Sequence, residues 1–181
     1  MRIETDINRI KEIAKIKNQE NWEFRSFLKQ LDMEIEEIDS IVHEINDDVT
    51  AQIDCTKCAN CCKLITPELD DEDISKFSVG LKMVKNQFIN TFLTKEEAPQ
   101  KDYIFNRQPC PFLKNNLCSY YHLRPKACVS YPHLHKKKFV LRLWSVVVNY
   151  SICPIVFNVY ERLKEELWHY NYDEYIDKED Y

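Results

Sequence analysis

Apolar residues recur at helical spacing over the first fifty positions. Between residues 3 and 14 they return every three or four positions, and a second stripe follows the polar residues 18–21. This period predicts helices that each bury one face. The second stripe alternates steps of three and four, which is also typical of coiled coils, and its members are Leu28, Leu31, Ile35, Ile38, Val42, Ile45 and Val49.

The heptad stripe leaves two interpretations of the N-terminal helices open, because a stripe indicates burial without naming the partner. In the favoured interpretation, residues 3–49 form an antiparallel helical hairpin that packs on its own domain. In the other, the stripe is the seam of a homodimer or of a complex with a protein partner.

Beyond residue 50 the helical period is interrupted. The stretch Cys55–Cys62 has no regular period and predicts a loop. Thr66-Pro67-Glu68 is typical of a helix start, with threonine as N-cap and proline in the first turn, and this helix is expected to end near Gly80. A second helical pattern covers residues 81–93, and the charged residues 94–106 are expected to be irregular.

The last part of the chain combines loops, a strand and a helix in our prediction. Residues 109–132 hold three cysteines and four prolines, which favours compact loops. Residues 139–148 are rich in β-branched and aromatic side chains and predict a strand. Cys153-Pro154 is expected to open a final helix, and the acidic, tyrosine-rich residues 169–181 are expected to be peripheral.

These patterns together predict a mainly α fold with a loop-rich cysteine or metal core and a small strand element. We expect a helical extension over residues 1–50, a cysteine-cluster domain over residues 51–168 that ends in a C-terminal helix, and a tail over residues 169–181. A chain of 181 residues, of which 44% are hydrophobic, is long enough to bury such a core.

Composition excludes several classes of function. The chain has one glycine, Gly80, whereas loops that cradle nucleotide phosphates need several. The net charge of −5 and the isoelectric point of about 5.6 argue against a nucleic-acid partner, which requires a positive field. The longest apolar stretch, near residues 146–148, is too short to cross a membrane, so no membrane association is expected.

The cysteine count is the unusual feature of the composition. The N-terminal residues do not resemble a secretory signal, so we expect a cytoplasmic protein. In that reducing compartment, eight cysteines are more often metal ligands or redox groups than a disulfide framework.

Four of the cysteines fall within eight residues, in the arrangement Cys55-x2-Cys58-x2-Cys61-Cys62. Two intervening residues allow neighbouring sulfurs to turn toward one ion, and this spacing is common in zinc and iron–sulfur sites. Adjacent side chains diverge, so Cys61 and Cys62 are not expected to ligate one tetrahedral ion together. One of the two is therefore expected to act elsewhere.

The other four cysteines are dispersed along the chain. They can complete a metal site only if the fold brings them together, and the alternative for each is a buried apolar thiol. The candidate metal ligands are therefore all eight cysteines, namely Cys55, Cys58, Cys61, Cys62, Cys110, Cys118, Cys128 and Cys153.

The spacing favours an iron–sulfur cluster over zinc. Ferredoxin-like clusters use a Cys-x2-Cys-x2-Cys run and a distant cysteine followed by proline. The run is present, and Cys110-Pro111 and Cys153-Pro154 each supply a cysteine before proline. Zinc is the alternative cofactor, with or without a histidine ligand drawn from His122, His133 or His135.

A short basic run, His135-Lys136-Lys137-Lys138, lies downstream of these cysteines. Such a run is typical of a solvated turn, and it is also able to contact an acidic partner or the chain's own acidic run, Asp70-Asp71-Glu72-Asp73.

Taken together, the cysteine motifs resemble the signature of the YkgJ-like CxxCxxCC family. The run at residues 55–62 is followed, in the family's order, by further motifs at residues 109–113, 118–121, 124–128 and 131–132, which read PCPFL, CSYY, RPKAC and YP. The resemblance covers about residues 55–132. It implies a zinc- or iron-chelating domain, with Cys153 as a candidate final ligand.

The resemblance also implies a microbial intracellular metalloprotein, distantly similar to flagellin lysine N-methylases, which carry the same kind of cysteine cluster. Three functional hypotheses follow. The first is a metal-binding protein with a redox or protein-modifying role. The second is a protein lysine N-methylase-like enzyme, and the third is a structural zinc module that mediates protein–protein interaction. No catalytic residue is identified, so whether the chain is an enzyme stays open.

Overall fold

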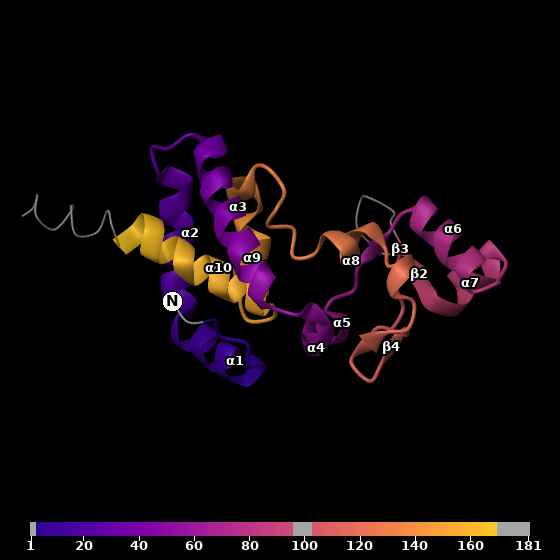
Figure 1. The fold of residues 1–181 in the computed structure, drawn as a ribbon. Helices are drawn as coiled ribbons and strands as arrows, with labels where there is room; N and C mark the ends of the chain where they lie inside the picture. The colour runs from indigo at the N-terminus through magenta and orange to yellow at the C-terminus, as the bar shows by residue number, and fades with distance from the viewer. Residues whose placement is uncertain (1–2, 96–102, 170–181) are drawn as a thin grey trace, which may run out of the picture. The chain divides into compact units, whose positions relative to one another are not determined.

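The computed structural model describes residues 3–95 and 103–169. The chain forms two compact units (Figure 1). The first, here called the helical unit, combines residues 1–54 with residues 132–181. The second, here called the cysteine unit, is the intervening segment 55–131.

These are units of packing, whereas the predicted domain limits, 1–50, 51–168 and 169–181, stay a prediction. Of the predicted tail, residues 170–181 lie outside the described residues. The described structure is mainly helical, with a few short antiparallel strands in the cysteine unit, so the predicted mainly α fold class is confirmed.

The helical unit is made of helices and helical turns. Its described elements are α1 (Ile7–Ile16), α2 (Asn18–Gln30), α3 (Ile35–Gln52), η2 (Phe139–Arg142), α9 (Leu143–Asn149), α10 (Pro154–Lys164) and η3 (Glu165–His169). The helices predicted over residues 3–49 are therefore confirmed, with a break after residue 30.

The helix α10 is the centre of the helical unit. It packs against α3, α1 and α9, and all but one of its residues are buried (Figure 1). Cys153 is its N-cap residue and Pro154 occupies its first turn, where the missing N–H of proline costs nothing. The predicted final helix is thus confirmed.

The heptad stripe does not run through one continuous helix. Leu31 is already extended and closes α2, so the stripe is divided between two helices. Within α3, Ile38, Val42 and Val49 are buried, whereas Ile35 is exposed. Because α3 packs against α10, its stripe is covered inside its own unit. The antiparallel hairpin of the favoured interpretation stays a prediction. A homodimer or protein partner at these helices stays a prediction.

The strand predicted over residues 139–148 is wrong, because this segment forms η2 and α9. Phe139, Leu143, Val146 and Val147 are buried, and their spacing of three to four is helical. Burial of one helical face therefore outweighs the β propensity of the individual residues.

A buried carboxylate fixes the start of this returning segment. Asp39 of α3 is 5% exposed, and it accepts hydrogen bonds from the backbone N–H groups of Lys138 (2.6 Å) and Phe139 (2.8 Å). The contact joins residues about a hundred positions apart in the sequence. It satisfies a buried charge and places Phe139 in the core.

The cysteine unit consists of short elements. Its described helices are α4 (Cys55–Cys58), α5 (Asn60–Leu64), α6 (Asp71–Gly80), α7 (Lys85–Phe92), η1 (Tyr121–Leu123) and α8 (Lys126–Ser130). Its strands are β1 (Glu68–Leu69), β2 (Leu93–Lys95), β3 (Tyr103–Phe105), β4 (Leu113–Lys114) and β5 (Leu117–Cys118). The order β1-β3-β2 makes one antiparallel sheet, and β4 and β5 pair as a hairpin.

Three predictions in this unit need correction. The segment Cys55–Cys62 is not a loop, because α4 and α5 form on either side of Ala59, whose φ of 52° separates them. Residues 94–106 are not wholly irregular, since β2 extends to Lys95 and β3 lies within this range. The third correction concerns the start of the next helix.

The helix that ends at Gly80 does not begin at Thr66. Its N-cap is Asp70, whose carboxylate accepts the N–H of Asp73 at 2.8 Å, whereas Glu68 lies in β1. Aspartate caps a helix at least as well as threonine, and β1 needs Glu68 extended for pairing with Ile104. The end at Gly80 and the following helix α7 are confirmed.

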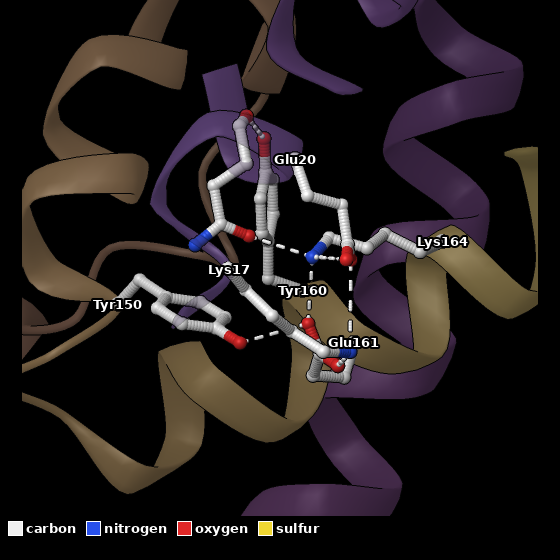
Figure 2. Close-up of polar contacts among 7 residues, drawn as sticks. Lys17, Glu20, Tyr150, Tyr160, Glu161 and Lys164 are labelled. Carbon is white, nitrogen blue, oxygen red and sulfur yellow. Dashed lines mark hydrogen bonds and ion pairs between the residues drawn. The ribbon is translucent and has the colours of Figure 1, made fainter. Parts of the chain in front are cut away.

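A buried ion network joins α2 to α10. The Lys164 ammonium is 1% exposed and donates to Glu20 (2.6 Å), Asn21 (2.6 Å) and Glu161 (2.7 Å), as Figure 2 shows. Lys17 and the Tyr150 hydroxyl, at 2.8 Å, also donate to the Glu161 carboxylate.

Opposite charges decide the ionisation state of this network. Burial by itself would raise the pKa of Glu161, but the hydrogen bonds from Lys164 and Lys17 outweigh burial and lower the pKa below 4.5. Burial raises the pKa of Tyr150 and Tyr160 well above 10, so both hydroxyls stay protonated and can donate.

Replacing Lys164 with methionine is expected to destabilise the protein by about 3–5 kcal/mol. The variant removes one of the two ammonium groups that donate to the buried Glu161 carboxylate and leaves only that of Lys17, and breaking a buried ion pair is costly. Urea denaturation followed by far-UV circular dichroism measures the change. Lys29→Met, on the exposed face of α2, is the matched control and is expected to stay within about 0.5 kcal/mol of the parent. Equal stability of the two variants would contradict the structural role of the network.

The Glu161→Gln variant is expected to be less stable than the parent protein, and this difference in the free energy of unfolding should become smaller as the pH falls. Because the folded pKa of Glu161 is lowered, its ionised form contributes stability that is fully present above about pH 4.5 and lost as the pH falls through the folded pKa. The deficit of the variant should therefore be constant between pH 6 and 7 and shrink once the pH falls below about 4.5. Urea midpoints of both proteins across this range test the point, and a deficit that does not change with pH would contradict it.

Candidate metal centre

An aromatic core stands behind the candidate ligands of the cysteine unit. Phe112 is buried, and its ring lies 5.1 Å from that of Phe77, 5.0 Å from Phe92 and 5.6 Å from Phe105, centroid to centroid. Such ring pairs stabilise a folded protein by more than the burial of their apolar surface alone would. Phe112 follows Cys110 by two residues, so this packing fixes the backbone that carries Cys110.

The hairpin β4–β5 carries Cys118 at the end of β5, and Cys110 lies in the turn just before β4. Leu113 pairs with Cys118, and the Ser119 N–H donates to the Phe112 carbonyl at 2.8 Å. Backbone N–H groups also point at sulfur, from Phe112 and Leu113 to Cys110 and from Tyr120 to Cys118. Hydrogen bonds of this kind stabilise the thiolate form that binds metals.

A third segment carries Cys128 on α8. The backbone N–H of Lys126 donates to the buried Asp73 carboxylate at 3.1 Å, and its ammonium bridges Asp70 (2.9 Å) and Glu72. These contacts hold the start of α8 against the N-terminal end of α6. The acidic run at residues 70–73 is the only trace of this anchor in the sequence, and our sequence reasoning did not identify Lys126.

The turn η1 connects Cys118 to Cys128 and packs against the single glycine. A Cβ atom on Gly80 would lie 2.2 Å from a methyl carbon of Leu123, so a side chain at this position would force the Leu123 side chain to shift. After the turn, the Arg124 guanidinium lies over the Tyr121 ring, 3.6 Å from its centroid, and its Nε donates to the Tyr121 carbonyl at 3.2 Å.

A fourth segment, α5, supplies Cys61 and Cys62. The Cys62 carbonyl accepts the Cys110 N–H at 2.9 Å, which ties α5 to the segment before the hairpin. Cys61 donates a side-chain hydrogen bond to the Cys62 sulfur. That these neighbours differ in role stays a prediction.

Four thiols from these segments interact electrostatically with one another, and they are Cys62, Cys110, Cys118 and Cys128. The hydrogen bond from Cys61, together with the positive charge of Arg124, lowers the pKa of Cys62 to about 6. Burial raises the pKa of the other three, and that of Cys128 reaches about 12. The group therefore combines one thiolate with three protonated thiols near neutral pH.

The four thiols are neighbours without being in ligand contact. Among residues 3–95 and 103–169, no three side chains of histidine, cysteine, aspartate or glutamate lie close enough together to hold a metal ion. Soft thiolates with N–H donors aimed at sulfur nevertheless fit zinc or iron in their chemistry. Their electrostatic interactions indicate that four of the eight predicted ligands, Cys62, Cys110, Cys118 and Cys128, lie near one another.

The remaining predicted ligands lie at other places. Cys55 is exposed and Cys58 half-buried, at the two ends of α4, and Cys61 is half-buried beside Cys62. Cys153 belongs to the helical unit and is buried at the start of α10. A ligand role for each of these four stays a prediction.

The histidine alternative is divided between the two units. His122 is exposed in η1, whereas His133 and His135 belong to the helical unit. Burial, together with the nearby cations Lys136 and Arg142, lowers the pKa of His133 to about 4, so its imidazole is neutral at neutral pH.

Comparison with known proteins bears on this group of cysteines. Residues 54–153 match the CxxCxxCC family model, whose description reads "Putative zinc- or iron-chelating domain". The chain belongs to the CxxCxxCC family. The match spans more than half of the chain, confirms the resemblance seen in the cysteine motifs and supports metal binding. No curated protein and no solved structure matches the chain.

The CxxCxxCC match extends to Cys153 and so includes all eight cysteines. The printed description gives zinc and iron as alternatives, so it leaves the choice between zinc and an iron–sulfur cluster open. In the described residues, no helix combines the length and the apolar character needed to cross a membrane.

Cys62 is expected to be the first thiol alkylated in the metal-free protein at pH 7, and Cys128 the last. A pKa of about 6 leaves Cys62 mostly ionised at this pH, whereas a pKa of about 12 leaves Cys128 protonated. Brief treatment with iodoacetamide after chelation, followed by peptide mass spectrometry, ranks the thiols. Arg124→Ala should slow the alkylation of Cys62 and leave that of the exposed Cys55 unchanged. Equal rates for Cys62 and Cys128 would contradict the arrangement.

Proposed function

We propose that this chain is a metal-binding protein in which Cys62, Cys110, Cys118 and Cys128 form one thiolate centre. The observation that carries the proposal is their electrostatic grouping, from four separate segments of the cysteine unit. A four-thiolate set is a full complement for a tetrahedral zinc ion, and also for an iron–sulfur cluster.

The surroundings of the four thiols support this assignment. N–H groups aimed at Cys110 and Cys118 stabilise negative sulfur, and the Arg124 guanidinium offsets part of the charge that thiolates accumulate. Metal binding must release protons from the thiols whose pKa is raised, and the free energy of metal–sulfur bonds is large enough for that exchange.

An iron–sulfur cluster is our first choice for the metal and zinc the second. The Cys-x2-Cys-x2-Cys run from Cys55 to Cys61 and the Cys110-Pro111 pair favour the cluster. The run is not among the four grouped thiols, so in this proposal Cys55, Cys58 and Cys61 serve a second site or exchange with the first. Cys153 is the remaining candidate ligand.

The other hypotheses gain no specific support. A redox or protein-modifying role, a protein lysine N-methylase-like activity and a structural zinc module with a protein partner all stay hypotheses. A cytoplasmic location likewise stays an expectation. The proposal is therefore limited to metal binding and its ligands.

Protein purified without oxygen is expected to be brown and to contain iron and acid-labile sulfide. Elemental analysis and the visible absorption spectrum measure both. A colourless protein with tightly held zinc would show that the metal is zinc and not an iron–sulfur cluster, and the proposed thiolate centre would stand. A protein without bound metal, which takes up neither zinc nor iron with sulfide, would overturn the proposal.

Ligand identity is tested by single substitutions in the same preparation. Cys118→Ser is expected to lower metal affinity by about 100-fold or more. Loss of a group that only supports a ligand costs about 10–100-fold, and loss of the ligand itself should cost more. Ser119→Ala, at the exposed neighbouring position, is the matched control and should retain the metal. Cys153→Ser decides whether the buried thiol of the helical unit is a ligand. Full metal content in Cys118→Ser would remove that residue from the centre.

A further inference from the structure

The helical unit carries an apolar ridge that faces solvent. Leu141, Trp144 and Val148 are 71%, 64% and 48% exposed, and they follow one another at steps of three and four along η2 and α9. Single exposed apolar residues are ordinary, but three on one helical face form a patch. We call these three residues the ridge. The opposite face of the same segment is buried, so the segment is fixed in place while the ridge is exposed in the part of the chain that the structure describes.

The central residue of the ridge is held in position by a second tryptophan. The rings of Trp144 and Trp22 lie 4.9 Å apart at an angle of 53°, and the Arg25 guanidinium lies 5.4 Å from the centre of the Trp22 ring. Tryptophan and arginine are the residues that most often dominate binding surfaces. Because the contact with Trp22 already restricts the side-chain rotamers of Trp144, Trp144 loses less conformational entropy when a partner binds.

Three consecutive lysines lie one turn before the ridge. Lys136, Lys137 and Lys138 are exposed, and within the described ranges, 3–95 and 103–169, their side chains make no ion pair. Their backbone is nevertheless anchored. Arg142 donates to the carbonyls of His133 (2.6 Å), Lys136 and Lys137 (3.2 Å), so the lysines start from a fixed loop.

We propose that the ridge and these lysines bind an acidic peptide segment of a partner protein, whose carboxylates meet Lys136–Lys138 while its apolar side chains cover Trp144. Charge complementarity selects this occupant. The sequence segments of the helical unit contain 22 acidic and 14 basic residues, so three adjacent lysines without acidic partners are a local exception in an acidic unit.

The same charges argue against two other occupants. An anionic membrane would approach the whole unit and meet its net negative charge, whereas a peptide contacts only the basic edge. A second copy of the chain that paired ridge to ridge would bring lysines against lysines, because a twofold contact uses the same patch twice. The proposal is independent of the metal centre, which belongs to the cysteine unit.

The test uses the full-length chain and a fluorescein-labelled peptide of glutamate and leucine, with leucines at steps of three and four. Fluorescence anisotropy measures binding. Two control peptides separate the contributions, one with lysine in place of glutamate and one with serine in place of leucine. We expect binding of the first peptide only, weakened by added salt as an ionic contact requires.

Two variants and their matched controls locate the site. Trp144→Ala and the double variant Lys136→Glu/Lys137→Glu should each weaken binding by about tenfold or more. Val79→Ala and Lys76→Glu/Lys82→Glu alter equally exposed residues of the cysteine unit and should leave binding unchanged. Circular dichroism verifies folding. Hydrogen exchange of the unmodified chain adds a readout without substitution, in which the peptide should slow exchange over residues 137–148.

Several results would overturn the proposal. One is equal binding of all three peptides, and another is binding that the substitutions of Trp144 and the lysines leave unchanged. Absence of peptide binding together with binding to phosphatidylserine vesicles would assign the ridge to a membrane surface. Absence of peptide binding with dimers that dissociate in Trp144→Ala, seen by sedimentation, would assign it to a second copy.

Discussion

The helical unit depends on the need to neutralise one buried ammonium group. Lys164 is removed from water, so its charge must be matched by acceptors on neighbouring helices, and α2 and α10 supply them through Glu20, Asn21 and Glu161. The Tyr160 hydroxyl adds a bond to the Asn21 carbonyl at 3.0 Å. Because α2 comes from the N-terminal segment and α10 from the C-terminal one, this network joins the two stretches of chain on either side of the cysteine unit.

In the cysteine unit the corresponding constraint is the packing around Phe112. The core of this unit is formed by apolar and aromatic side chains of α6, α7 and the three-stranded sheet, together with Phe112 and Leu123. Cys110 and Cys118 pack against that core, so its rings help to position the backbone that carries them.

Sequence patterns determined the helices far better than the site. The spacing of apolar residues was sufficient to predict the helices α1, α2, α3, α7 and α10. It failed for residues 139–148, where β-branched residues favoured a strand although the buried residues lie on one helical face. The cysteine spacing identified the candidate ligands, whereas their grouping could not be predicted. It depends on contacts between distant positions, such as the bond from Cys110 to the Cys62 carbonyl and that from Lys126 to Asp73. No local pattern encodes such contacts.

In the proposed centre, the adjacent cysteines would have different tasks. Cys61 donates to Cys62, and this bond keeps one sulfur of the group ionised while burial keeps Cys110, Cys118 and Cys128 protonated. Four thiolates close together would repel one another, so the metal-free group is stable with a single negative charge. A cation that binds first at Cys62 would then lower the pKa of the other three in turn. In the proposed centre, the thiolate that would start this sequence is the one whose charge the Arg124 guanidinium offsets, and that guanidinium lies over the Tyr121 ring.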